Sequence, residues 1–163
     1  MDEHLLLSSE KSRPETDLRV RTSDPEVFNF PIRPKRDIMN LMNQEIFRAY
    51  DIRGKYGKDF DGDDTYAIAR MFGVFVKKKS KKRFPAIVVS YDSRRTSRLL
   101  SKKVIEGLVD AGVRVINTGE TSTPLHYFAV NHAGADGGIM ITASHLGKEF
   151  NGFKLSLREA RPI

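Results

Sequence analysis

The stretch Pro85-Ala86-Ile87-Val88-Val89-Ser90-Tyr91 decides the fold of this chain. It is a short run of apolar, mostly β-branched residues behind a proline, which is typical of a strand buried on both faces of a sheet. Similar runs occur at 113–116 and 138–142, and a fourth strand is predicted at 153–157. The sequence therefore predicts a sheet whose central strands are fully covered.

A helical pattern precedes the first of these strands. Asp64 is placed to cap a helix over residues 65–79, because an aspartate side chain can accept hydrogen bonds from the free N–H groups of a first turn. The apolar side chains of this segment recur at helical spacing and form one broad face, which consists of Ile68, Met71, Phe72, Phe75 and Val76.

Two more helices are predicted between the later strands. One begins at Thr96 or Ser97 and ends at Gly112, a glycine in the position that favours a C-terminal cap. The next carries Pro124 in its first turn and runs through His132. Strands that alternate with helices imply right-handed crossovers and a layered α/β domain.

Residues 1–45 differ in composition from the rest of the 163-residue chain. They hold four of the seven prolines and none of the glycines, and they show no sustained apolar period. We expect a flexible extension over residues 1–45, followed by the α/β domain over residues 46–163. The chain has no cysteine, no apolar run of membrane-spanning length and no positively charged start, so a soluble, cytoplasmic protein is expected.

Residues 46–163 carry 21 Lys and Arg against 12 Asp and Glu, which favours anionic partners such as phosphorylated small molecules or nucleic acid. The densest cationic run spans Lys77–Arg83. Its ordinary interpretation is a solvated helix end, where cations suit the helix dipole. Binding of nucleic acid is the other interpretation, but no aromatic residue interleaves the lysines to stack on bases.

Polar residues follow three of the predicted strands, at 91–97, 117–124 and 142–149. Ligands of open α/β sheets gather beyond the carboxyl ends of strands. The third loop contains Ser144 beside His145, a hydroxyl nucleophile with a base nearby. Lys154 could bring a cation to a phosphate or move a proton. The alternative is that these residues are ordinary turn formers.

Upstream, Arg53 precedes Gly54, and an arginine beside a glycine suits close approach of the backbone to an anion. The guanidinium can hold two oxygens of that anion in a fork. A surface ion pair between Arg53 and Asp51 is the equally weighted alternative, because it uses the same fork.

Together these segments resemble the α-D-phosphohexomutase superfamily, the phosphoglucomutases and phosphomannomutases. The resemblance rests on five motifs in the family's order, spanning about two thirds of the chain: Phe47–Gly54, Tyr91–Arg94, Gly119–Ala129, Gly137–His145 and Phe150–Lys154. It implies the family's domain I, a three-layer α/β/α domain with a mixed, mostly parallel sheet.

By this resemblance, Ser144 matches the serine that carries a phosphoryl group and passes it between positions 1 and 6 of a hexose phosphate, through a bisphosphate intermediate. Arg53 and Tyr50 match residues near that phosphate. His145 and Lys154 match residues of proton transfer, with Lys154 also close to the phosphate. Mg²⁺ would bind an oxygen of the phosphate on Ser144, which is thereby the metal-binding position.

Leu146-Gly147 stands where the family usually has Asn-Pro, and Ser122 replaces a usual proline. The resemblance covers domain I only, so domains II–IV, with the aspartate ligands of the metal, are expected to be absent from the chain. We therefore expect a truncated mutase that is inactive alone. Complementing domains or self-association are expected partners, and a non-catalytic binding or regulatory domain is the alternative function.

Overall fold

The computed structural model describes residues 42–163. The elements, in chain order, are η1 (Gln44–Ile46), β1 (Ile52–Lys55), α2 (Gly62–Ser80), β2 (Ala86–Tyr91), α3 (Ser97–Asp110), β3 (Arg114–Glu120), α4 (Thr123–His132), β4 (Gly137–Ile141), β5 (Phe150–Leu157) and η2 (Arg158–Ala160). The predicted extension over residues 1–45 lies almost wholly outside the described residues, so it stays a prediction.

The strands form one sheet in the order β1-β5-β4-β2-β3. Parallel pairs join β4 to β2 and β2 to β3, whereas β5 is antiparallel to both of its neighbours. Four of the five strands of the described residues therefore point the same way and β5 opposes them. This confirms the expected mixed, mostly parallel sheet.

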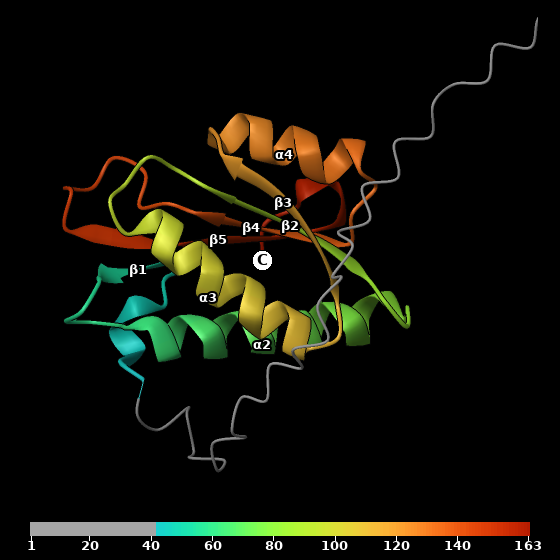
Figure 1. The fold of residues 1–163 in the computed structure, drawn as a ribbon, viewed down its shortest axis with the longest axis horizontal. Coiled ribbons are helices and arrows are strands. Elements are labelled where there is room, and N and C mark those ends of the chain that lie inside the picture. The colour runs from blue at the N-terminus through green and yellow to red at the C-terminus, as the bar shows by residue number, and fades with distance from the viewer. Residues whose placement is uncertain (1–41) are drawn as a thin grey trace, which may run out of the picture. The chain divides into compact units, whose positions relative to one another are not determined.

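Helices cover both faces of the sheet (Figure 1): α2 and α3 lie on one face and α4 on the other. The strand β2 contributes side chains to the cores on both faces of the sheet, because successive side chains of a strand point to opposite faces. Ile87 and Val89 belong to the core beneath α2 and α3, while Ala86 and Val88 pack with Val130 of α4. The three-layer α/β/α architecture is thus confirmed.

The start of α2 differs from the prediction. Asp61, not Asp64, is the N-cap residue, and its Oδ1 accepts hydrogen bonds from the N–H groups of Asp63 and Asp64, at 2.8 and 3.0 Å. In turn, Oδ2 of Asp64 accepts a hydrogen bond from the Asp61 N–H, which completes a capping box. Burial raises the pKa of the Asp64 carboxyl.

The end of α3 agrees with the prediction. Gly112 has φ +74°, its N–H donates to the carbonyl of Val109, and the N–H of Val113 donates to that of Leu108. This is a Schellman motif, in which the left-handed residue is a glycine because a side chain would add strain. Thr96 is the N-cap residue of α3, but its side chain makes no capping bond.

The second predicted loop is shorter than expected, because β3 continues to Glu120 and takes up the first four of its residues. The other two predicted loops lie where the sequence placed them, after β2 and after β4. Within residues 42–163, no helix is long and apolar enough to cross a lipid bilayer.

Candidate active site

Strand β1 lies against β5 at a glycine. Arg53 on β1 is paired with Gly152 on β5, in antiparallel register. A Cβ atom on Gly152 would collide with the carbonyl oxygen of Ile52. The absence of a side chain at position 152 therefore lets β1 approach β5 closely, and this close pairing sets the position of Arg53 at the edge of the sheet.

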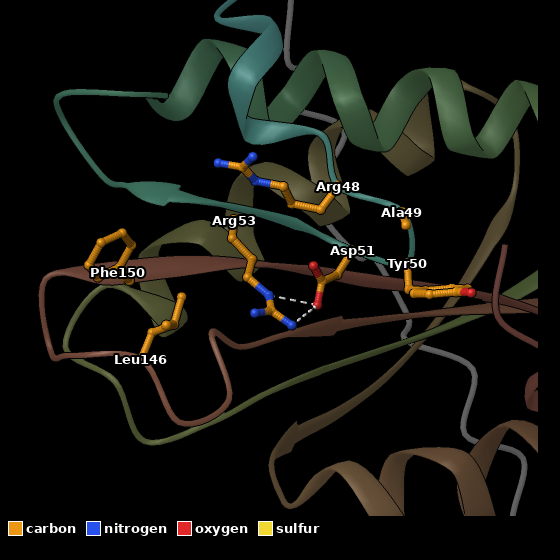
Figure 2. A pocket seen from close by; sticks show the side chains of 7 residues that line it. All are labelled: Arg48, Ala49, Tyr50, Asp51, Arg53, Leu146 and Phe150. Carbon is orange, nitrogen blue, oxygen red and sulfur yellow. Dashed lines mark hydrogen bonds and ion pairs between the residues drawn. The ribbon is translucent and has the colours of Figure 1, made fainter.

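Asp51 lies just before β1 and its side chain is only 6% exposed. Its Oδ2 accepts a hydrogen bond from Nε of Arg53 at 2.7 Å, which Figure 2 shows. The same oxygen lies 3.4 Å from Nζ of Lys154 on β5. One buried carboxylate thus holds two cations that come from opposite ends of the domain sequence.

A pocket opens beside this ion pair (Figure 2). Its wall is formed by residues of the 48–53 segment, by one residue of the loop before β5 and by the first residue of β5. The lining residues are Arg48, Ala49, Tyr50, Asp51, Arg53, Leu146 and Phe150. Tyr50 is 76% exposed, so its ring lies at the surface of this region. Arg53 lies in the pocket wall with its Nε and Nη2 bound to Asp51, so the Asp51–Arg53 ion pair, one of the two alternatives that the sequence offered, is formed.

Ser144 lies in the loop between β4 and β5, three residues after the last residue of β4, and it is exposed. Its φ is +56°, the left-handed region, which costs a residue other than glycine about 1–2 kcal/mol. The Ser144 N–H donates to Oγ1 of Thr142 at 2.9 Å. The loop therefore turns sharply at Ser144 and leaves its hydroxyl accessible.

The sheet relates this loop to Arg53. The N–H of Thr142 donates to the carbonyl of Gly152 at 3.0 Å, and Gly152 is the residue paired with Arg53. Thr142, Gly152 and Arg53 form one row across neighbouring strands, so two strand spacings, roughly 10 Å, separate Thr142 from Arg53. Ser144 is two residues beyond that row.

The structure brings some of the predicted site residues together around one pocket and one carboxylate. Tyr50 and Arg53 line one pocket, and Lys154 joins it through Asp51. Ser144 and His145 are exposed in the loop that supplies Leu146 to the pocket wall, but they are not lining residues themselves. Leu146 thus presents an apolar side chain to the pocket.

The sequence offered Asp51 only as a surface partner of Arg53. The pair forms, but the Asp51 carboxylate is buried and also meets Lys154, which sequence reasoning missed. The bond to Lys154 spans 103 positions of sequence and exists only once β1 lies beside β5. The sequence signal that could have indicated this role is the position of Asp51 itself, an acidic residue between the two predicted site residues Tyr50 and Arg53.

A buried serine–histidine pair lies elsewhere, between the sheet and α4. Oγ of Ser90 is 2.7 Å from Nδ1 of His126 and 2.6 Å from Oγ1 of Thr118. Burial lowers the pKa of His126 to about 4, and within residues 42–163 its Nε2 has no hydrogen-bond partner. His126 is therefore neutral at ordinary pH and is enclosed in the core.

Carboxylate oxygens are the side-chain ligands that Mg²⁺ prefers. Within the described residues there is no group of three or more His, Cys, Asp or Glu side chains that could hold a metal ion. Asp51, the carboxylate of the pocket, is already engaged by Arg53 and Lys154. The residues present do not form a complete Mg²⁺ site by themselves.

Comparison with known proteins gives a consistent family. Residues 44–163 match the family described as "Phosphoglucomutase/phosphomannomutase, alpha/beta/alpha domain I". The phosphomannomutase of Escherichia coli K12 is 45% identical over 117 residues, which cover 72% of this chain and 24% of that protein. The phosphoglucomutase of Neisseria gonorrhoeae is 39% identical over 120 residues, covering 73% and 25%. The chain thus spans about a quarter of the length of these relatives.

Solved structures agree with the sequences. A phosphoglucomutase/phosphomannomutase family protein from Burkholderia thailandensis superposes with a TM-score of 0.67 at 38% identity, over 73% of this chain and 27% of that protein. The sequence and structure comparisons therefore cover similar shares of the chain. The chain belongs to the phosphoglucomutase/phosphomannomutase family, and its residues 44–163 match the family's alpha/beta/alpha domain I.

Proposed function

We propose that this domain carries the phosphoserine of a phosphohexomutase, an isomerase of carbohydrate metabolism that moves phosphate between C1 and C6 of a hexose. The observation that best supports this is the arrangement around Asp51. It sets two cations, Arg53 and Lys154, beside a pocket that the Ser144 loop helps to form. Anionic phosphate groups need such positive charge.

In the proposed reaction, a sugar hydroxyl attacks the phosphorus of phospho-Ser144. An oxygen–phosphorus bond to the sugar forms, and the bond to Oγ of Ser144 breaks. The proton of the hydroxyl passes to His145 or Lys154, and the departing Oγ of Ser144 takes up a proton. In the second transfer the Ser144 hydroxyl loses its proton as it takes the other phosphate, and the sugar oxygen that gives up this phosphate receives a proton from His145 or Lys154. Arg53 and Tyr50 would hold the phosphoryl group in position. The reaction needs positioning and charge neutralisation more than covalent catalysis.

Mg²⁺ is proposed as the cofactor, with an oxygen of the phosphate on Ser144 as the one ligand that this chain provides. Because the described residues do not complete a metal site, the carboxylate ligands would come from outside residues 42–163. We propose for the same reason that the chain is inactive alone, and that hexose phosphate and bisphosphate turn over only with complementing domains.

A graft tests the proposed function. Residues 44–163 replace the matching segment of the Escherichia coli phosphomannomutase, and conversion of mannose 1-phosphate to mannose 6-phosphate is measured. Activity in the graft, lost in Ser144→Ala and kept in the distant control Ser80→Ala, is expected. A folded graft with no activity, or one in which Ser144→Ala changes nothing, would contradict the proposal and favour a binding or regulatory domain.

A further inference from the structure

Arg94, just after β2, makes an unusual set of contacts with the Ser144 loop. Its Nη2 donates to the backbone carbonyls of Ser144 and Leu146, at 2.7 and 2.8 Å. Its Nη1 donates to those of Gly147 and Phe150, at 2.8 and 3.0 Å. One side chain therefore binds four carbonyl oxygens within residues 144–150, which comprise the end of the loop and the first residue of β5.

The fifth N–H of the guanidinium is also used. Nε of Arg94 donates to Oδ2 of Asp92 at 3.1 Å, and Oδ1 of Asp92 accepts from the backbone N–H of Arg94 and from the hydroxyl of Ser97. A guanidinium has five N–H donors in a fixed fork, so every one of them has an acceptor here. The side chain of Arg94 is only 14% exposed.

Asp92 and Ser97, which hold Arg94 in place, are hydrogen-bonded to the sheet. The N–H of Asp92 donates to the carbonyl of Ile141, the last residue of β4, at 3.0 Å. Nδ2 of Asn151, near the start of β5, donates to Oγ of Ser97 at 2.9 Å. Asp92 and Ser97 are thus anchored to the two strands that the Ser144 loop connects, and they orient Arg94 between them.

We propose that Arg94 is a positioning residue, which holds the loop in the conformation that presents Ser144 for phosphoryl transfer; this inference rests on the proposed function. Ser144 has the left-handed φ that residues other than glycine keep only where their surroundings enforce it. Thr142 binds the Ser144 N–H and Arg94 binds its carbonyl. Gly147, the most permissive residue of the loop, is held by the same guanidinium.

Lysine cannot replace this group, although it keeps the charge. Its ammonium has three donors on one atom and cannot reach carbonyls arranged around a planar fork. Arg94→Lys therefore separates the geometry of the guanidinium from its charge. Arg95→Lys is the matched control, because Arg95 is the next residue and is exposed.

The first test follows the loop directly in the 163-residue chain. In the wild type, the Nη protons of Arg94 are expected as separate, slowly exchanging NMR signals. Arg94→Lys is expected to speed amide hydrogen exchange in peptides over residues 142–151 by about tenfold or more, while Arg95→Lys leaves it unchanged. Averaged Nη signals in the wild type contradict the proposal even if Arg94→Lys fails to fold, and so does unchanged exchange in a folded Arg94→Lys.

The second test follows the reaction. Transfer of phosphate from a hexose 1,6-bisphosphate to Ser144 is timed by mass spectrometry in the graft described above. Arg94→Lys is expected to slow the maximal rate about 100-fold, with little change in the half-saturating bisphosphate concentration. A wild type that accepts phosphate and an Arg94→Lys that accepts it equally fast contradict the role of Arg94 alone. A wild type that never accepts phosphate contradicts the proposed function as well.

Discussion

At Asp51, a single carboxylate with 6% of its side chain exposed lies against both Arg53 and Lys154. Either cation without that carboxylate would be free to swing into solvent, since the side chains of Arg53 and Lys154 are 31% and 27% exposed. The role of Asp51 is therefore to limit the positions of two groups that are proposed to contact phosphate.

Asp51→Asn keeps the shape of this side chain and removes its charge. We expect the maximal rate of phosphoryl transfer in the graft to fall about 10- to 100-fold, because small misplacements of catalytic groups have effects of this size. Steady-state kinetics of the graft measure it. The exposed Glu45→Gln, six residues upstream, is the control and should keep full activity. Equal rates in Asp51→Asn and Glu45→Gln would contradict the positioning role.

His126 makes the stability of the domain depend on pH. Burial lowers its pKa to about 4 in the folded protein, against an ordinary value of 6.5. The unfolded chain therefore binds more protons as the pH falls below 6.5, and the folded state is disfavoured. The contribution is absent at pH 7 and amounts to about 3 kcal/mol of lost stability at pH 4.

Urea unfolding between pH 7 and pH 4 measures this effect in the chain. His126→Leu cannot take up a proton, so we expect its unfolding free energy to fall less steeply with acid than that of the wild type. His132→Gln, at an exposed position of the same helix, should keep the wild-type slope. The same slope in His126→Leu and the wild type would show that another group is responsible.

Among the elements, β1 depends most on a single position. It has only four residues and pairs with β5 alone in the sheet order. Gly152→Ala would force a methyl group against the backbone of Ile52 and push β1, with Arg53, away from β5. Overpacking of this kind costs about 1–3 kcal/mol.

Unfolding of the chain in urea tests this expectation. A Cβ on Gly62, the first residue of α2, would meet the Lys103 side chain at an ordinary 3.7 Å, so Gly62→Ala is a control with little expected effect. If Gly152→Ala were as stable as Gly62→Ala, close packing of β1 on β5 would not be what fixes this edge of the sheet.

The strand β2 could be predicted from sequence because its core residues are consecutive and fully apolar. The strand β1 could not, since it is short and half-buried and is stabilised by β5, about a hundred residues later. The cap of α2 was misassigned because Asp61 and Asp64 are both acidic residues near the helix start and only the backbone geometry distinguishes them.

The candidate site divides in the same way. Residue type and motif single out Arg53, Tyr50 and Ser144. Tyr50 and Arg53 line the pocket and Ser144 is in the loop that supplies Leu146 to its wall, while the roles of all three stay predictions. The contacts that organise them were not predictable, because Asp51–Lys154 and the Arg94 bonds to the loop join residues 50 or more positions apart. Such contacts depend on strand order, which local patterns do not specify.

For the whole molecule, its net charge and the share of its relatives' length that it matches both bear on the proposed function. Residues 46–163 have nine more cationic than anionic side chains, so a phosphorylated sugar would be attracted from a distance at low salt. The match spans about a quarter of the Escherichia coli phosphomannomutase. The domain is therefore proposed to supply the phosphoserine and its cations, while other parts complete the enzyme.

The most direct test of this account is a phosphopeptide map of the protein purified from the cells that produce it, before and after exposure to a hexose 1,6-bisphosphate. The account predicts a phosphoryl group on Ser144, present at purification or gained from the bisphosphate, and absent from Ser144→Ala. Complete coverage of the loop peptide with Ser144 unmodified under both conditions would contradict it.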